Sequence, residues 1–149
     1  MGTAFNGFDK SEDQEEKKRL EHERLLKQHL KKNEGGFIMP NLQNYFIKLL
    51  SEKKKTINDV AKRGSVGASN LAKIYEGVRL APKRDTVIKI GFGLELSIQE
   101  CQDFLQYCEV GLLNPKIRRD SIIMFCLDIN VNAKECDRML SGENERGII

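Results

Sequence analysis

Apolar residues recur at helical spacing along the middle of the chain. Near the start of this region they follow spacings of three and one, which places them on one side of a helix: Leu42, Tyr45, Phe46, Leu49 and Leu50. Thr56 and Asp59 have the spacing of a capping box, with Asp in place of the usual Glu, and predict the start of a short second helix. That helix turns Ile57, Val60 and Ala61 inward.

A third helix is predicted at residues 68–76, with three apolar positions: Leu71, Ile74 and Tyr75. The segment from Gly64 to Gly67 reads as a tight turn before it, and Gly77 is well placed to end it. Two short helices joined by a short glycine-containing turn can form a helix-turn-helix. The pattern therefore predicts an all-α fold with this motif at its centre.

The part of the chain that follows contains an internal repeat. A shift of 35 residues carries Arg84–Asp85 onto Arg119–Asp120 and Ser97–Glu100 onto Asn132–Glu135, the latter two as equivalent capping boxes. Further positions match or are conservative: Ile88/Ile123, Leu94/Ile129, Leu96/Val131, Cys101/Cys136 and Leu105/Leu140. Each unit is one helix, a short turn and a second helix, and the Asp of each Arg–Asp pair suits the positive end of a helix dipole. We expect the two helix pairs to stack and share a core.

Residues 1–38 differ in character from the rest. Their middle is dense in Glu, Lys and Arg, and its aliphatic residues are few: Leu20, Leu25, Leu26 and Leu30. So thin a stripe predicts an exposed charged helix or a disordered extension, with a coiled-coil partner helix as the alternative. A second hypothesis is that this segment does not belong to the native protein. Glu34 to Met39 can be encoded by a purine-rich ribosome-binding sequence followed by a start codon at Met39.

The positive charge is concentrated in one third of the chain. Residues 41–95 hold eleven Lys and Arg against five Asp and Glu, whereas residues 1–38 are balanced and residues 96–149 are acidic. A local excess of basic residues is what a surface that binds a polyanion needs. The alternative is an ordinary solvated surface, and charge alone does not decide between the two.

Several functional classes lack their sequence signals. No apolar run approaches the roughly 20 residues that span a bilayer, and no signal peptide is evident, so we expect a cytoplasmic protein without a membrane partner. The four cysteines have no CxxC spacing and both histidines lie far from them, which predicts free thiols and no metal site. Gly91-Phe92-Gly93 lacks the lysine of a phosphate loop. We expect no enzyme, no cofactor and no small-molecule substrate.

The helix-turn-helix suggests how DNA would be bound. With Leu71 and Ile74 facing the core, the opposite side of the third helix offers three candidates for base contacts: Ser69, Asn70 and Lys73. Candidates for phosphate contacts surround them: Lys62, Arg63, Gly67, Ala68, Arg79, Lys83 and Arg84. Gly67 and Ala68 leave the N-terminus of this helix uncrowded, so that a phosphate can approach its N–H groups. The alternative is a helical hairpin with solvated Lys and Arg side chains.

At these residues the chain resembles the lambda-repressor-like (Cro-type, XRE) helix-turn-helix family. The matching residues are Ala61, Val66, Ser69, Leu71, Lys73, Ile74, Gly77, Arg79, Pro82 and the apolar run from Val87 to Leu94. Residues 42–149 also resemble small bacterial regulators that have two helix pairs, each with an Arg–Asp start. The resemblance implies a transcriptional regulator that binds double-stranded DNA, with residues 68–76 as the recognition helix and a homodimer on two half-sites.

Three positions depart from the family pattern. Ile57 stands where the family usually has Gln, Ala68 where it often has Arg, and Ser65 where it has the turn glycine. These changes remove polar groups that read bases, so the alternative is a protein-interaction module that keeps the fold. The expected organisation is an N-terminal extension at 1–38, a helix-turn-helix domain at 41–111 and a C-terminal helix pair at 112–149 packed on it.

Overall fold

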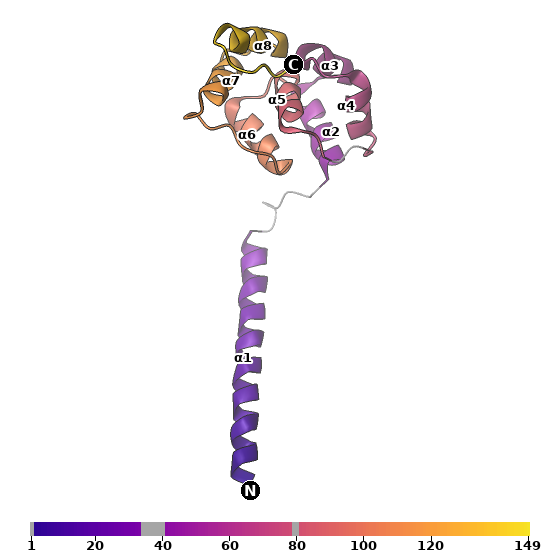
Figure 1. The fold of residues 1–149 in the computed structure, drawn as a ribbon. Helices are drawn as coiled ribbons and strands as arrows, with labels where there is room; N and C mark the ends of the chain where they lie inside the picture. The colour runs from indigo at the N-terminus through magenta and orange to yellow at the C-terminus, as the bar shows by residue number, and fades with distance from the viewer. Residues whose placement is uncertain (1, 34–40, 79–80) are drawn as a thin grey trace. The chain divides into compact units, whose positions relative to one another are not determined.

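The chain forms a series of α-helices. The computed structural model describes residues 2–33, 41–78 and 81–149, and no strand occurs in these ranges. The helices are α1 (Gly2–Lys32), α2 (Leu42–Lys53), α3 (Ile57–Gly64), α4 (Ala68–Tyr75), α5 (Arg84–Gly93), α6 (Ile98–Tyr107), α7 (Arg118–Asp128) and α8 (Ala133–Gly142) (Figure 1). The prediction of an all-α fold is therefore confirmed. The chain divides into two units, residues 1–39 and residues 40–149.

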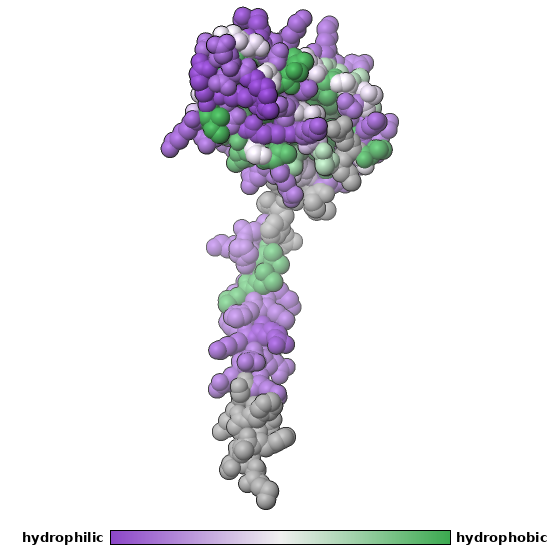
Figure 2. Space-filling model, viewed as in Figure 1, coloured by the Kyte–Doolittle hydropathy of each residue, from purple (hydrophilic) through white to green (hydrophobic). Residues whose placement is uncertain are grey.

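Helix α1 makes up most of the first unit, and its described side chains, at residues 12–32, are all exposed. Every residue from 12 to 33 is exposed, and its four leucines are between 44% and 59% exposed. Figure 2 shows a mostly hydrophilic surface on this helix, with a hydrophobic patch near its C-terminal end. An exposed charged helix is one of the two states that the sequence predicts for this segment.

The second unit is built from helical hairpins with the same turn. One residue in each turn adopts the left-handed conformation: Lys54 (φ 54°), Glu95 (φ 57°) and Asn130 (φ 58°). Lys54 directly follows α2, and the other two stand two residues after the end of α5 and of α7. Two residues later a side chain caps the next helix: Thr56, Ser97 or Asn132. The turn therefore occurs three times, between α2 and α3, α5 and α6, and α7 and α8.

The caps explain where these helices begin. The hydroxyl of Ser97 accepts the N–H of Glu100 at 3.1 Å, and the carboxylate of Glu100 accepts the N–H of Ser97 at 2.9 Å. Asn132 makes only half of this arrangement, because it accepts the N–H of Glu135 at 2.8 Å while the Glu135 carboxylate binds Arg138. The predicted second capping box is thus a single side-chain cap.

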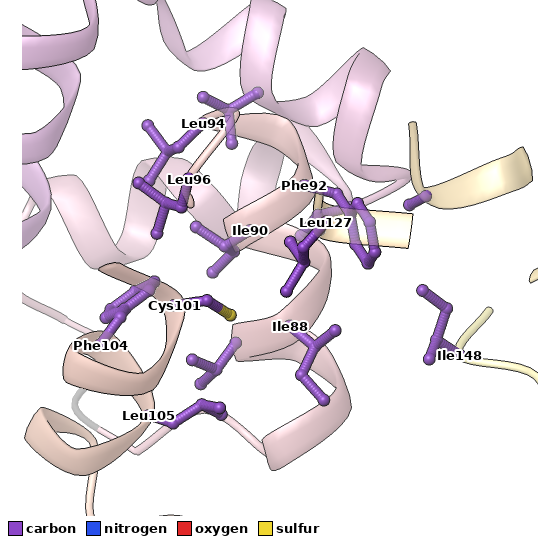
Figure 3. Close-up of a cluster of buried hydrophobic side chains, with 14 of the residues drawn as sticks. Ile88, Ile90, Phe92, Leu94, Leu96, Cys101, Phe104, Leu105, Leu127 and Ile148 are labelled. Atoms are coloured by element: carbon purple, nitrogen blue, oxygen red, sulfur yellow. The ribbon is translucent and has the colours of Figure 1, made fainter. Parts of the chain in front are cut away.

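Helix α5 lies at the centre of the second unit. Most of its last seven residues are buried, because α3, α6 and α8 all contact it. Figure 3 shows its apolar side chains in one cluster with residues from α6, α7 and the C-terminus, including Phe104, Leu127 and Ile148. Three cysteines are buried and the fourth is half-buried, and all four are free thiols as predicted: Cys101, Cys126, Cys136 and Cys108.

Two glycines allow α3 and α5 to touch. A Cβ on Gly64 would lie 2.4 Å from the carbonyl oxygen of Lys89, and a Cβ on Gly93 would lie 2.5 Å from the carbonyl oxygen of Val60. The sequence predicted that Gly64 begins the turn, but Gly64 is the last residue of α3. It lies where this helix touches α5. The turn itself begins at Ser65, whose φ is 53°.

The Arg–Asp pairs of the internal repeat bind each other crosswise. Arg84 of α5 donates from Nη2 to Asp120 of α7 at 2.9 Å, and Arg119 of α7 donates from Nη2 to Asp85 of α5 at 3.1 Å. Both aspartates stand in the first turn of their helices, as predicted. Reciprocal contacts of this kind arise from an approximate two-fold relation between the α5–α6 pair and the α7–α8 pair.

The same two arginines also hold the chain after the second helix of each pair. Arg84 donates from Nε to the carbonyl oxygen of Gly111 at 2.8 Å, and Arg119 donates from Nε to that of Arg146 at 2.8 Å. Gly111 and Arg146 are 35 residues apart, as the two arginines are. The repeat therefore includes the segments that follow α6 and α8, which the sequence comparison did not reveal.

Candidate nucleic-acid interface

Helices α3 and α4 form the predicted two-helix motif. They are joined by Ser65, Val66 and Gly67, and the N–H of Val66 donates to the carbonyl oxygen of Ala61 at 3.1 Å. Val66 is 7% exposed and anchors the turn in the core. Gly67 precedes α4 without a side-chain cap, so backbone alone forms the start of this helix.

Helix α4 has one buried side and one outward side. Leu71 and Ile74 are buried, whereas Ser69 and Lys73 are exposed, as expected for a recognition helix. Asn70 is half-buried, with its amide nitrogen 3.4 Å from where a Cβ of Gly67 would stand. Tyr75 differs from its sequence pattern, because 43% of it is exposed. The three predicted base-contacting residues thus lie on one helix, with Ser69 and Lys73 the more accessible.

The structure describes six of the seven predicted phosphate-contacting residues, and these six fall into two groups. Lys62 and Lys83 are exposed, and so are Gly67 and Ala68 at the start of α4. Arg79 lies outside the described residues. The other two members of the set, Arg63 and Arg84, hold internal contacts.

Arg63 and Arg84 are structural residues in this fold. Arg63 donates from Nε to the carbonyl oxygen of Phe92 at 3.1 Å and from Nη2 to that of Asn130 at 2.7 Å, and so fastens α3 to the ends of α5 and α7. Arg84 is held by Gly111 and Asp120. Guanidinium groups already bound in this way have few N–H groups left for phosphate. We therefore leave both arginines out of the candidate interface.

The structure adds residues that the sequence reasoning missed. A groove of about 800 Å³ runs between α2, the start of α3 and α4, and it is lined by Ile47, Leu50, Ser51, Lys55, Thr56, Ile57, Asn58, Ala68, Ser69, Ala72 and Tyr75. Asn58, an exposed amide, therefore shares the groove with Ser69. A signal for this region was present in the sequence, since three consecutive lysines precede the capping box at Thr56.

Positive charge continues along α3 but is mixed with acids. A second hollow of about 400 Å³ is lined by four basic and two acidic side chains, with two further residues: Lys54, Lys55, Lys62, Arg63, Asp59, Glu95, Gly93 and Asn132. The pKa of Asp59 is lowered, mainly because its carboxylate accepts a hydrogen bond from the backbone N–H of Thr56. The side chain of Thr56 lowers this pKa further. Lys55 forms an ion pair with Glu95. Lys54 and Lys62 are the exposed lysines of this hollow.

Two other features are absent from the described part of the chain. There, no three His, Cys, Asp or Glu side chains are grouped so that they could hold a metal ion. None of the helices in the same ranges has the length and apolar character needed to cross a membrane. Compared with models of known protein families, with curated proteins and with solved structures, the chain has no match.

Proposed function

We propose that the protein is a DNA-binding regulator of transcription, with α4 as its recognition helix and a fold of the lambda-repressor-like type. One observation carries this proposal. Helix α4 buries Leu71 and Ile74 and exposes Ser69 and Lys73, on a short helix joined to α3 by a three-residue turn. A helix of this kind can enter the major groove while its partner helix lies across the backbone.

The proposed contacts follow from exposure. Ser69 and Lys73 reach base edges, where Lys suits guanine and Ser adapts to several partners, and Asn70 supports them from its half-buried position. Phosphates lie against the N–H groups at the start of α4 and against the exposed lysines around it: Lys54, Lys62 and Lys83. These lysines carry no sequence information and set the position of the protein on the duplex.

Binding to a selected DNA sequence tests the proposal. Changing Lys73 to Ala is expected to reduce preference for that sequence roughly tenfold, because one good base contact contributes about 1–3 kcal/mol of discrimination. Lys62→Ala is expected to weaken all sequences alike and to lower the slope of log affinity against log salt by about 0.9. Lys134→Ala is the matched control, since Lys134 is an exposed lysine on α8. Equal losses in all three variants would show unspecific charge attraction and refute the proposed interface.

A protein-interaction module is the second candidate, and the groove beside α4 favours it. Six of its lining residues are apolar: Ile47, Leu50, Ile57, Ala68, Ala72 and Tyr75. An apolar side chain of a partner protein fits such a groove better than a phosphate does. Binding through it would depend weakly on salt and show a negative heat capacity change, whereas DNA binding would depend steeply on salt.

A further inference from the structure

The two halves of the repeat bury their equivalent surfaces to very different extents. On one side of α5 and at its C-cap the apolar residues are fully buried: Val87, Ile90 and Leu94. Their equivalents on α7 and at its C-cap, 35 residues later, are half-buried or exposed: Ile122, Phe125 and Ile129. Phe125 is 52% exposed and Ile129 is 46% exposed. The repeat therefore presents on α7 an apolar face that it covers on α5.

The cover over α5 and α6 comes from the preceding helices. Helix α3 packs on α5, and Tyr45 of α2 stacks on two rings of α6, with ring centroids 5.6 Å from Phe104 and 4.3 Å from Tyr107. The positions equivalent to these two rings on α8 are Met139 and Gly142. Neither residue has a ring that could stack as Phe104 and Tyr107 do, and a groove of about 460 Å³ lies here between α7 and α8.

The rim of this groove carries both signs of charge. Arg118 and Arg138 line it together with Glu143, around an apolar floor that includes Ile122, Phe125 and Met139. Within the chain, Arg118 pairs with Glu143 at 2.6 Å, and both side chains are 59% exposed. In a two-fold contact, residue i of one copy faces residue j of the other and j faces i, so a rim that carries both signs of charge allows Arg to pair with Glu twice across the axis.

We propose that this α7–α8 face binds the same face of a second copy of the chain. Phe125 of each copy enters the groove of the other and takes the place that Tyr45 holds over α6. The arginines and glutamates of the two rims then pair across the interface. An aromatic anchor in a pocket with arginines around it is the composition typical of the centre of protein interfaces. The inference does not depend on DNA binding, since it concerns a different surface.

Sedimentation equilibrium of the full chain without DNA tests this interface. The unmodified protein is expected to form dimers, and Phe125→Asp is expected to raise the dimer dissociation constant about 30-fold or more, as loss of a central anchor does. Leu112→Asp is the matched control, because Leu112 is 49% exposed and lies outside the groove. It introduces the same charge and removes a similar apolar surface, and it is expected to leave the dissociation constant unchanged.

Cross-linking gives a second measurement that does not depend on weakening the fold. A Ser121→Cys variant, treated with a short bis-maleimide, is expected to yield covalent dimers, because Ser121 is exposed and lines the groove while Phe125 stays in place, whereas Leu112→Cys is not. A monomer at all concentrations, or a dimer that withstands Phe125→Asp, would overturn the proposal. So would dissociation by Leu26→Asp and not by Phe125→Asp, because α1 would then be the element that joins the copies.

Discussion

The crossed Arg–Asp pairs invite a direct comparison of two equivalent aspartates in unequal surroundings. The side chain of Asp120 is 4% exposed, whereas that of Asp85 is 33% exposed. Asp120 accepts from Arg84 at 2.9 Å and from the backbone N–H of Asn114 at 2.9 Å. The carboxylate of Asp85 accepts two hydrogen bonds from Arg119, at 3.1 and 3.3 Å. We therefore expect Asp120→Ala to destabilise the protein more than Asp85→Ala does.

The expected magnitudes follow from burial. Asp120→Ala removes two bonds to a buried carboxylate, each of about 1.5–3 kcal/mol when charge takes part, and leaves the Asn114 N–H without its acceptor. Because Arg84 keeps its carbonyl partners, we expect a loss of about 3–4 kcal/mol in the free energy of unfolding. Asp85→Ala breaks a partly solvated pair, for which about 1 kcal/mol is typical.

Urea denaturation, followed by circular dichroism, measures both losses. The coupling free energy from double-mutant cycles is expected to be larger for Arg84 with Asp120 than for Arg119 with Asp85. Equal losses for the two aspartates, or a larger loss for Asp85, would refute the reasoning. Such a result would mean that the exposed fraction of the carboxylate does not decide how much each pair contributes.

Two further predictions concern the joint between α3 and α5 and the pH dependence of stability. Gly93→Ala is expected to cost about 1–3 kcal/mol in urea denaturation, because the added methyl group overlaps the carbonyl oxygen of Val60; an unchanged midpoint would contradict the close contact. The pKa of Glu95 is lowered, mainly by its bond with Lys55 and then by that with Asn130. Since the folded value lies below the unfolded one, this stabilisation is present above pH 4.5 and is lost as pH falls through the folded value. The stability advantage of the wild type over Glu95→Gln should therefore shrink below pH 4.5, and a constant difference would contradict it.

Local signals in the sequence predicted the helices well. The capping residues Thr56 and Ser97 and the spacing of apolar residues act within a few positions of the chain, so their effect can be read directly. The repeat was visible for a similar reason, because its two halves keep the same residues at the same offset. Of the candidate site, the inward and outward sides of α4 followed from Leu71 and Ile74.

The sequence could not predict which partners the long polar side chains bind. Arg63 and Lys62 are neighbours in the same basic stretch, yet Arg63 fastens α3 to α5 and α7 while Lys62 stays exposed. Which of them turns inward depends on carbonyl groups 29 and 67 residues away. The groove beside α4 was unpredictable for the same reason, since it is lined by three different helices.

The packing of α5 also determines where the second unit can be cut. The predicted boundary at residue 111 separates α5 from the residues that complete its surroundings, including Leu127 and Ile148 of the same buried cluster (Figure 3). A chain that ends there loses these contacts, the Asn130 acceptor of Arg63 and the Asp120 acceptor of Arg84. Each fully buried aliphatic side chain lost removes about 1.5–3 kcal/mol.

We expect such a chain to lose cooperative thermal unfolding, measured by circular dichroism. A chain that begins at Met39 is the control, because residues 40–149 form one compact unit, and it should keep the midpoint of the full chain. If the chain that ends at residue 111 melted cooperatively at that midpoint, the α7–α8 pair would be an accessory. Helices α2 to α6 would then be stable without the crossed Arg–Asp pairs.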